Sequence, residues 1–300
     1  MKTIINPVNS SIIKQELKNC SFIKKTKRLE NEIYILDNQR APNIIKEIGR
    51  LRELTFRYAG AGVGKEIDID HFDINPNQYQ QLIIWDPYKN KIIGGYRFKK
   101  FFKGEKILLS NLATATIYNI SDIFINNYLP YLVDLGRAFI QPDYQARNQS
   151  RGSLFALDNL WEGLGTLVKD DIRFFFGRIV IYPNTDIMVR DSIFYFFHKH
   201  FHKNNNLVTP QKKIELKIDL DRLKSIFKYD NYVEDFKILN QIAKDKKERI
   251  PPLISAYMNL SPSMQSFGVT IDPTFGNVYE VCILITIADI YPKIINRYMR

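Results

Sequence analysis

Apolar residues recur along the chain with the spacing of helices in some segments and of strands in others. Residues 43–60 repeat their apolar positions every three or four residues, and the glycines of GAGVG follow. This spacing predicts a helix with one apolar face that ends near Gly60. The same reasoning predicts a helix near 121–129, a strong helix over 153–168 and another over 185–201.

Short apolar runs bounded by turn residues predict the strands. One such run is EIYILDN (32–38). A hairpin is predicted over 81–100, with QLIIWD as its first strand, PYKN as its turn and KIIGGYRFKK as its second strand. The Gly94-Gly95 pair inside that hairpin predicts a bulge or a close approach of another backbone. YLVDLGRAFI (131–140) is expected to be a central strand. FFFGRIVIYP and a closing hairpin from SFGVTI to VYEVCILITIA complete the set.

The order of these elements predicts the fold class. Helices and strands alternate, with hairpins near both ends, which favours a mixed α/β sheet over a purely parallel one. We expect a polar N-terminal arm over 1–30 with one weak helix, and a single domain over 31–300, because no Pro/Gly/Ser-rich linker divides the chain. A charged helical stretch near 219–250 is expected to be an insertion.

Composition restricts the class of protein. With 300 residues and 45% hydrophobic content, the chain can bury a sizeable core. Two distant cysteines form no disulfide framework, and the N-terminus lacks the apolar run of a signal peptide, so we expect a cytoplasmic protein. No apolar run approaches the roughly 18–20 residues of a membrane span. The net charge of +11 attracts anionic partners: nucleic acid, anionic lipid or an acidic protein.

The loop QPDYQARNQSRG, between the strand 131–140 and the helix 153–168, carries the most informative chemistry. Backbone N–H groups and the dipole at a helix N-terminus favour an anion. The spacing Arg147-x-x-Ser150-x-Gly152 resembles the pyrophosphate loop of GNAT acyltransferases, and Arg151 adds positive charge. We therefore expect these four residues to bind the acyl donor.

Several motifs carry a wider resemblance. EIGRLRELTFR, GKEIDIDHFD, LIIWD, IIGGYRF, LGRAFIQPDYQ, LFALDNLWEGLG and IDPTFGNV occur in this order. The chain thus resembles the bacterial N-acyltransferases that make the lyso forms of ornithine and glycine lipids, also called hemolysin-like proteins. It looks closest to the Bacteroidetes-type branch and is distantly similar to the acyl-homoserine-lactone synthases. Two positions depart from the pattern: Asp134 stands where the family usually has Glu, and Ser150 where a plain GNAT loop has Gly.

The resemblance implies both a fold and an activity. The fold is a GNAT-like mixed, mostly antiparallel sheet flanked by helices. The activity is transfer of a fatty or 3-hydroxyfatty acyl group from acyl carrier protein to the amine of glycine or ornithine, in membrane lipid biosynthesis. The donor is a phosphopantetheine thioester, with acyl-CoA as an alternative, and no tightly bound cofactor is implied.

The reaction indicates which residues to look for. Aminolysis of a thioester needs a neutral amine, an oxyanion stabiliser and a proton for the leaving thiolate. GNAT folds use backbone N–H groups of a splayed central strand for the oxyanion, which implicates LGRAFI. As the base we expect Asp134 first and Asp70 second, and as the acid Tyr144.

Three arginines are candidates for binding the amino acid: Arg52, Arg97 and Arg137. A guanidinium binds a carboxylate through two parallel hydrogen bonds. In a regular strand, however, Asp134 and Arg137 point to opposite faces. Both can serve one cleft only if a bulge resets the alternation, in which case Asp134→Asn should lower kcat far more than it alters KM for the amino acid.

Other signals favour ordinary structural roles. His198, His200 and His202 do not all face one way on a helix, and the aspartates of EIDIDHFD lack the Gly and Glu of an EF-hand, so we expect no metal. The clusters FFF (174–176) and FYFF (194–197) are read as core, with an acyl-chain groove as the alternative.

Two other functions stay open at this point. One is a basic protein that binds a membrane surface or nucleic acid without catalysis, although no nucleic-acid-binding motif is present and we expect no such partner. The other is an acyl-CoA-dependent N-acetyltransferase. Peripheral contact with the inner membrane is compatible with the enzyme, because its product would be lipid-like.

Overall fold

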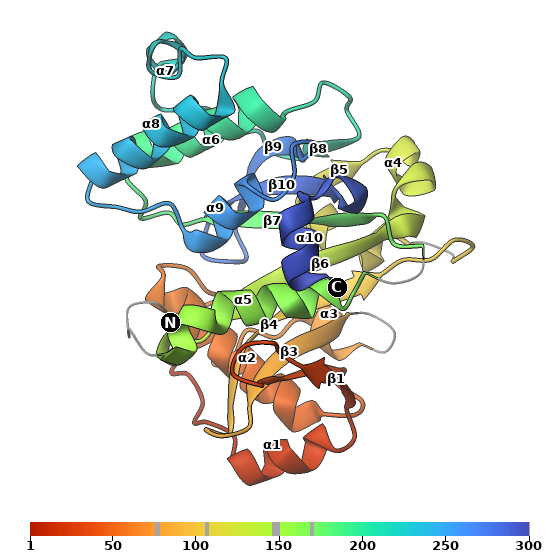
Figure 1. Cartoon of the computed structure of the whole chain (residues 1–300). Coiled ribbons are helices and arrows are strands. Elements are labelled where there is room, and N and C mark those ends of the chain that lie inside the picture. The colour runs from red at the N-terminus through yellow and green to blue at the C-terminus, as the bar shows by residue number, and fades with distance from the viewer. Residues whose placement is uncertain (76–78, 106–107, 146–150, 169–170, 300) are drawn as a thin grey trace.

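The protein, described here by a computed structural model, forms one large sheet with helices on both faces (Figure 1). The structure describes residues 1–75, 79–105, 108–145, 151–168 and 171–299. Within these residues the main sheet has eight strands in the order β1-β2-β3-β4-β6-β7-β10-β9. All neighbours are antiparallel except β6 and β7, which are parallel. The expected mixed, mostly antiparallel sheet is therefore confirmed.

The strands of this sheet, apart from β1, coincide with the apolar runs of the sequence. Their bounds are β1 Ser21–Lys25, β2 Glu32–Leu36, β3 Gln80–Asp86, β4 Lys91–Lys100, β6 Leu132–Ile140, β7 Phe174–Ile181, β9 Gln265–Asp272 and β10 Val278–Thr286. A separate pair consists of β5 Tyr118–Ile120 and β8 Val208–Pro210. β6 lies in the middle of the main sheet, as predicted.

The helices include the predicted ones, in the predicted order, and also α3 and α10, which were not predicted. Their bounds are α1 Ser10–Leu17, α2 Pro42–Tyr58, α3 His71–Ile74, α4 Asp122–Asn127, α5 Arg151–Gly165, α6 Ile187–Phe201, α7 Leu220–Ile226, α8 Tyr232–Asp245, α9 Pro252–Met258 and α10 Pro292–Tyr298. The stretch expected to be a helical insertion contains α7 and α8, and α8 packs along α6 (Figure 1).

Different elements pack on the two faces of the sheet. On one face, which we call the α5 face, α5 packs on β3 and β4, and α6, α8 and α9 extend the same apolar core. On the other face, the α2 face, α1 and α2 cover one half. α4 and the β5–β8 pair lie over the other half of that face. Each half of the α2 face has its own apolar cluster, and charged side chains lie between them.

Two glycines let neighbouring strands approach β4 closely. The register between β3 and β4 shifts between Ile84 and Trp85, next to Gly94. A Cβ on Gly94 would overlap the carbonyl oxygen of Phe139 on β6, and one on Gly95 would lie 2.5 Å from the carbonyl oxygen of Leu82. The predicted bulge and the predicted close approach both occur here.

Three strands were not predicted: β5 and β8 of the separate pair, and β1 of the main sheet. β1 lies within the arm assigned to residues 1–30 and pairs with β2 at the edge of the main sheet. Its sequence, SFIKK, is short and largely solvent-exposed, so it carries no apolar run to reveal it. Among the described residues, none of the helices has the length and apolar character that a membrane crossing requires.

Candidate active site

The two parallel strands at the centre of the sheet separate partway along their length. β6 and β7 pair from Leu132 opposite Phe174 to Leu135 opposite Gly177, and the described pairing ends there. A cavity of about 120 Å³ opens beyond this point, lined by both strands. Since the strands have parted, the cavity reaches from one face of the sheet to the other.

The cavity has two chemically distinct ends. Its apolar end lies on the α5 face and is lined by Phe175, Leu253, Ile254, Tyr257, Ile283 and Ile285. Its charged end lies on the α2 face and is formed by Arg137, Arg178 and Glu280, with Phe56 and Phe275 as walls. Gly136 stands between the two ends, and a Cβ added there would meet nothing within 4 Å.

A bulge in β6 lies beside this opening. Gly95 of β4 is opposite Phe139, but Arg97 is opposite Gly136, so β6 has one extra residue between the two pairs. Arg137 takes up the bulge with a left-handed backbone, φ +50°. Arg137 and Ala138 therefore lack a cross-strand partner on β4, and pairing with β7 has already ended. Where such a bulge leaves a backbone N–H without an acceptor, that N–H can bind a carbonyl oxygen that becomes an oxyanion.

Arg137 is held against the cavity wall. Its Nε lies 3.1 Å from Oδ2 of Asp68, which is fully buried. Its guanidinium lies 4.0 Å from the centre of the Phe275 ring, a cation–π contact. Burial raises the pKa of Asp68, and Arg137 opposes that shift. The structure thus brings Arg137 to the cavity, and its role in binding an anionic substrate group stays a prediction.

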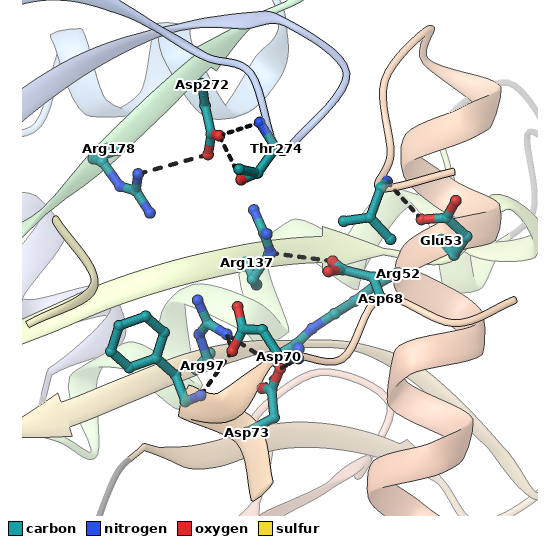
Figure 2. Close-up of polar contacts among 12 residues, drawn as sticks. Arg52, Glu53, Asp68, Asp70, Asp73, Arg97, Arg137, Arg178, Asp272 and Thr274 are labelled. Carbon is teal, nitrogen blue, oxygen red and sulfur yellow. Dashed lines mark hydrogen bonds and ion pairs between the residues drawn. The ribbon is translucent and has the colours of Figure 1, made fainter. Parts of the chain in front are cut away.

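Arg178 and Glu280 also line the cavity, and neither was among the site residues predicted from the sequence. Arg178 NH1 lies 2.6 Å from Glu280 Oε2 and 3.9 Å from Asp272 Oδ2. Figure 2 shows Arg178 beside Asp272 and Thr274, with Arg137 and its partner Asp68 nearer the centre of the view. Burial raises the pKa of Glu280, and Arg178 opposes that shift. The available signal was a single Glu within the apolar run VYEVCILITIA.

Arg52 and Arg97 belong to a buried ion network beside the cavity. Arg52 donates to Asp73 Oδ1 at 2.9 Å and to Gln81 at 2.6 Å. Arg97 donates to Asp70 Oδ1 at 2.7 Å and to Asp73 Oδ2 at 3.1 Å (Figure 2). Burial alone would raise the pKa of Asp73, but the two arginines hold it well below its usual range.

This network limits what its members can do for a substrate. Neither Arg52 nor Arg97 is among the described residues that line the cavity, which Arg137 and Arg178 do line. Asp70 also caps α3 by accepting from the Phe72 N–H. The arrangement fixes α3 and the end of β4 in place.

Asp134, the first candidate for the base, is fully buried. Its carboxylate accepts a hydrogen bond from the Tyr79 hydroxyl and one from Thr114 Oγ1 at 3.2 Å. Burial raises its pKa to about 6, which suits a group that exchanges protons near neutral pH. Among the described residues that line the cavity, Asp134 is absent. The bulge follows Asp134 in the strand, so it brings Arg137 but not Asp134 to the opening.

Tyr144 lies at the other end of the sheet. Its hydroxyl donates to Asp86 Oδ2 at 2.8 Å, and its side chain is buried. Asp86 pairs with Lys91 of β4, whereas Asp134 pairs with Lys99. Eight residues of strand separate these points, roughly 26 Å. The structure therefore does not bring Tyr144 together with Asp134, and burial with the bond to Asp86 raises the pKa of the Tyr144 hydroxyl.

The predicted donor loop is described only at its end. Arg147 and Ser150 lie outside the described residues, as does the side chain of Arg151. Arg151 and Gly152 form the first turn of α5, which begins after the loop that follows β6. The role of these four residues stays a prediction. In the described parts of the chain, no group of three or more His, Cys, Asp or Glu side chains is arranged to hold a metal ion.

Comparisons with known proteins agree with this geometry. Residues 51–153 match the family model described as an acetyltransferase (GNAT) domain, a range that runs from α2 through β6 into α5. No solved structure matches the chain.

Two curated relatives cover almost the whole chain. A protein of Phocaeicola vulgatus, named glycine N(alpha)-acyltransferase, is 43% identical over 97% of this chain and 90% of its own length. A protein of Bacteroides thetaiotaomicron with the same name is 42% identical over 97% of this chain and 87% of its own length. Together with the splayed, bulged central strand, these likenesses show that the chain belongs to the family of GNAT-type N-acyltransferases that includes these two Bacteroidetes proteins.

Proposed function

We propose that the protein transfers a fatty acyl group from acyl carrier protein to the amine of glycine. The observation that carries this proposal is the cavity with two unlike ends. An acyl chain fits the apolar end on the α5 face, and an amino acid fits the charged end on the α2 face. The thioester carbonyl would then lie at Gly136, beside the bulge at Arg137 and Ala138.

Glycine is favoured as the acceptor for two reasons. Both curated relatives bear the name glycine N(alpha)-acyltransferase. The rings of Phe56 and Phe275 also border the charged end of the cavity. A long side chain with its own ammonium, as in ornithine, would have to share this space. We therefore rank glycine above ornithine.

A carrier protein is favoured as the donor because of charge. The chain has a net charge of +11, and acyl carrier proteins are acidic, so long-range attraction would speed their encounter. The apolar end of the cavity also supports a long acyl group over an acetyl group, since each buried methylene contributes about 0.8 kcal/mol. The N-acyl product would be an amphiphile, which supports a place in membrane lipid biosynthesis and contact with an anionic membrane surface.

The test is an in vitro transfer assay. Purified protein is incubated with 3-hydroxyacyl carrier protein and, separately, glycine, ornithine, serine or alanine, and the products are identified by mass spectrometry. We expect N-acyl glycine as the main product. Parallel reactions replace the donor with the matching acyl-CoA or with acetyl-CoA. Product with ornithine alone, or with acetyl-CoA in preference to the long-chain donors, would overturn the proposal.

A further inference from the structure

The charged end of the cavity carries groups of both signs close together. Arg178 lies between two carboxylates, those of Glu280 and Asp272. The ion pair with Glu280 is short but poorly aligned: within the described chain, Arg178 NH1 and Glu280 Oε2 have no partner in hydrogen-bond geometry. Buried polar atoms without a hydrogen bond are rare and usually have a reason. Here both atoms belong to residues that line a cavity.

A small zwitterion is the class of ligand that such a pair would bind. A guanidinium binds a carboxylate through two parallel N–H donors, and a carboxylate accepts hydrogen bonds from an ammonium. A purely anionic ligand, such as a phosphate or a free fatty acid, would be repelled by Glu280. The position of both side chains follows from the sheet register, since Cys282 is opposite Arg178 and Glu280 is two residues from Cys282, on the same face.

We infer that Arg178 and Glu280 form the acceptor site, in which Arg178 binds the carboxylate of the amino acid and Glu280 takes the proton from its amino group. The inference rests on the proposed function and adds to it the residues that hold and activate the acceptor. It assigns the base to β10, in place of Asp134 on β6 or Asp70 beside α3.

The location of Glu280 supports this role over that of the earlier candidates. Glu280 lines the same cavity as Gly136, Arg137 and Ala138, whereas Asp134 and Asp70 are not among the described residues that line it. β10 is two strands from β6 in the sheet order. Two inter-strand spacings amount to about 10 Å, which a Glu side chain and a small amino acid span together.

The reaction balances with these groups alone. Glu280 removes one proton from the ammonium, and the neutral nitrogen attacks the carbonyl carbon of the thioester. The oxygen takes the negative charge beside the bulge, and the C–S bond then breaks with its electron pair leaving on sulfur. The second proton lost by the nitrogen ends on that sulfur. The products are an N-acyl amino acid and a free thiol, and Glu280 returns its proton to solvent.

The groups around Glu280 determine its proton affinity. Burial raises the pKa of its carboxyl, and the charged and titratable groups that act on it from the neighbouring elements are Arg178 on β7, Asp272 on β9, Arg137 on β6, Tyr118 on β5 and Cys282 on β10 itself. A carboxylate with a raised pKa is a better base near neutral pH than an ordinary one.

The main experiment compares Glu280→Gln with wild type in the transfer assay as a function of pH. We expect kcat with glycine to fall about 10²–10⁴-fold, with KM for the acyl donor unchanged. Without an internal base, the rate of the variant should rise about tenfold per pH unit toward the pKa of free glycine, because only the spontaneously neutral amine reacts. A loss of folded protein alone would not produce this slope.

Two further variants make the result interpretable. Glu280→Asp keeps the charge but shortens the reach, so partial activity with the wild-type pH profile is expected. Glu162→Gln is the matched control, since Glu162 is equally buried but lies on α5 and accepts from the Lys27 N–H at 3.0 Å. Its kcat should equal that of wild type. Full kcat and an unchanged pH profile in Glu280→Gln, with turnover lost in Asp134→Asn, would overturn the inference and return the role to Asp134.

Binding without turnover separates this inference from the proposed function. Titration of wild type with glycine in the calorimeter, with no donor present, should give a Kd that rises at least tenfold in Arg178→Lys, which keeps the charge but loses the two-pronged geometry. If wild type makes no N-acyl glycine, the proposed function fails, and the calorimetry still decides the acceptor site. Equal affinities in wild type and Arg178→Lys would refute the site even if transfer occurs.

Discussion

The buried carboxylate of Asp134 gives the sharpest test of the electrostatics of this sheet. Its pKa is raised to about 6 by burial, against about 3.9 for an exposed Asp. A group with a raised pKa in the folded state stabilises the fold in its protonated form. Its contribution is fully present below about pH 4 and is lost as the pH rises through about 6. The variant Asp134→Asn cannot ionise, so this pH dependence should disappear.

The magnitude follows from the two pKa values. The full shift of about two units corresponds to about 3 kcal/mol. Between about pH 4 and pH 7 the folded state binds more protons than the unfolded state, and integration over that window gives a loss of about 2 kcal/mol in the free energy of unfolding. Asn also changes the hydrogen bonds from Tyr79 and Thr114, but that effect is independent of pH. It cancels when the same two proteins are compared at two pH values.

The measurement is urea unfolding of wild type and Asp134→Asn at both pH values. Relative to wild type, the variant should gain about 2 kcal/mol on going from pH 4 to pH 7. Asp221→Asn is the control, because Asp221 is an exposed carboxylate paired with Lys224 on α7, and its curve should run parallel to that of wild type. Parallel curves for Asp134→Asn as well, or a relative loss of stability at pH 7, would refute the argument that burial dominates at this position.

Four other predictions concern two glycines, the donor site and the partner. Gly94→Ala should destabilise the fold by about 2 kcal/mol or more in denaturant unfolding, because the added Cβ overlaps the backbone of Phe139, and a stability equal to that of wild type would contradict this. Gly136→Ala should fold normally but lose at least tenfold in kcat/KM, because the added methyl group fills part of the cavity. Full activity of Gly136→Ala would contradict this second prediction. Arg147→Ala combined with Arg151→Ala should raise KM for the acyl donor with kcat little changed, and an unchanged KM in a folded protein would remove that assignment. With carrier-bound donor, kcat/KM should fall as salt rises, because steering by charge is screened beyond about 8 Å at physiological ionic strength, and a flat profile would count against recognition by charge.

Much of the fold could be predicted because local patterns determine it. The helix α2 repeats its apolar residues every three or four positions, and β3 and β4 are joined by a short turn, so neighbouring residues carry the signal. The edge strand β1 could not be predicted in this way. It is held by pairing with β2 and exposes most of its side chains, so its amino acids hardly differ from those of a polar loop.

The site was harder to predict, because it depends on which strands become neighbours. Arg178 and Glu280 are far apart in the sequence, and only the pairing of β7 with β10 brings them together. Charge in the sequence also does not show which arginines are enclosed in an ion network. Arg52 was proposed to bind substrate, yet its guanidinium is buried between Asp73 and Gln81, where removing it would leave a buried carboxylate with less compensation.

The bulge in β6 shows how one residue links the regular sheet to the cavity. Strict alternation would place Arg137 on the face opposite Asp134. The sequence alone does not show whether the strand is regular or contains a bulge that changes this. The structure decides it through the left-handed backbone at Arg137, which lets the side chain reach Asp68 on the α2 face. A non-glycine residue in that conformation costs of order 1 kcal/mol and persists only where surrounding contacts fix it. The ion pair with Asp68 and the contact with Phe275 supply such contacts, and both also hold Arg137 at the charged end of the cavity. The left-handed backbone at Arg137, the shift in register with β4 and the position of a cation at the charged end of the cavity therefore all occur at one bulge in β6.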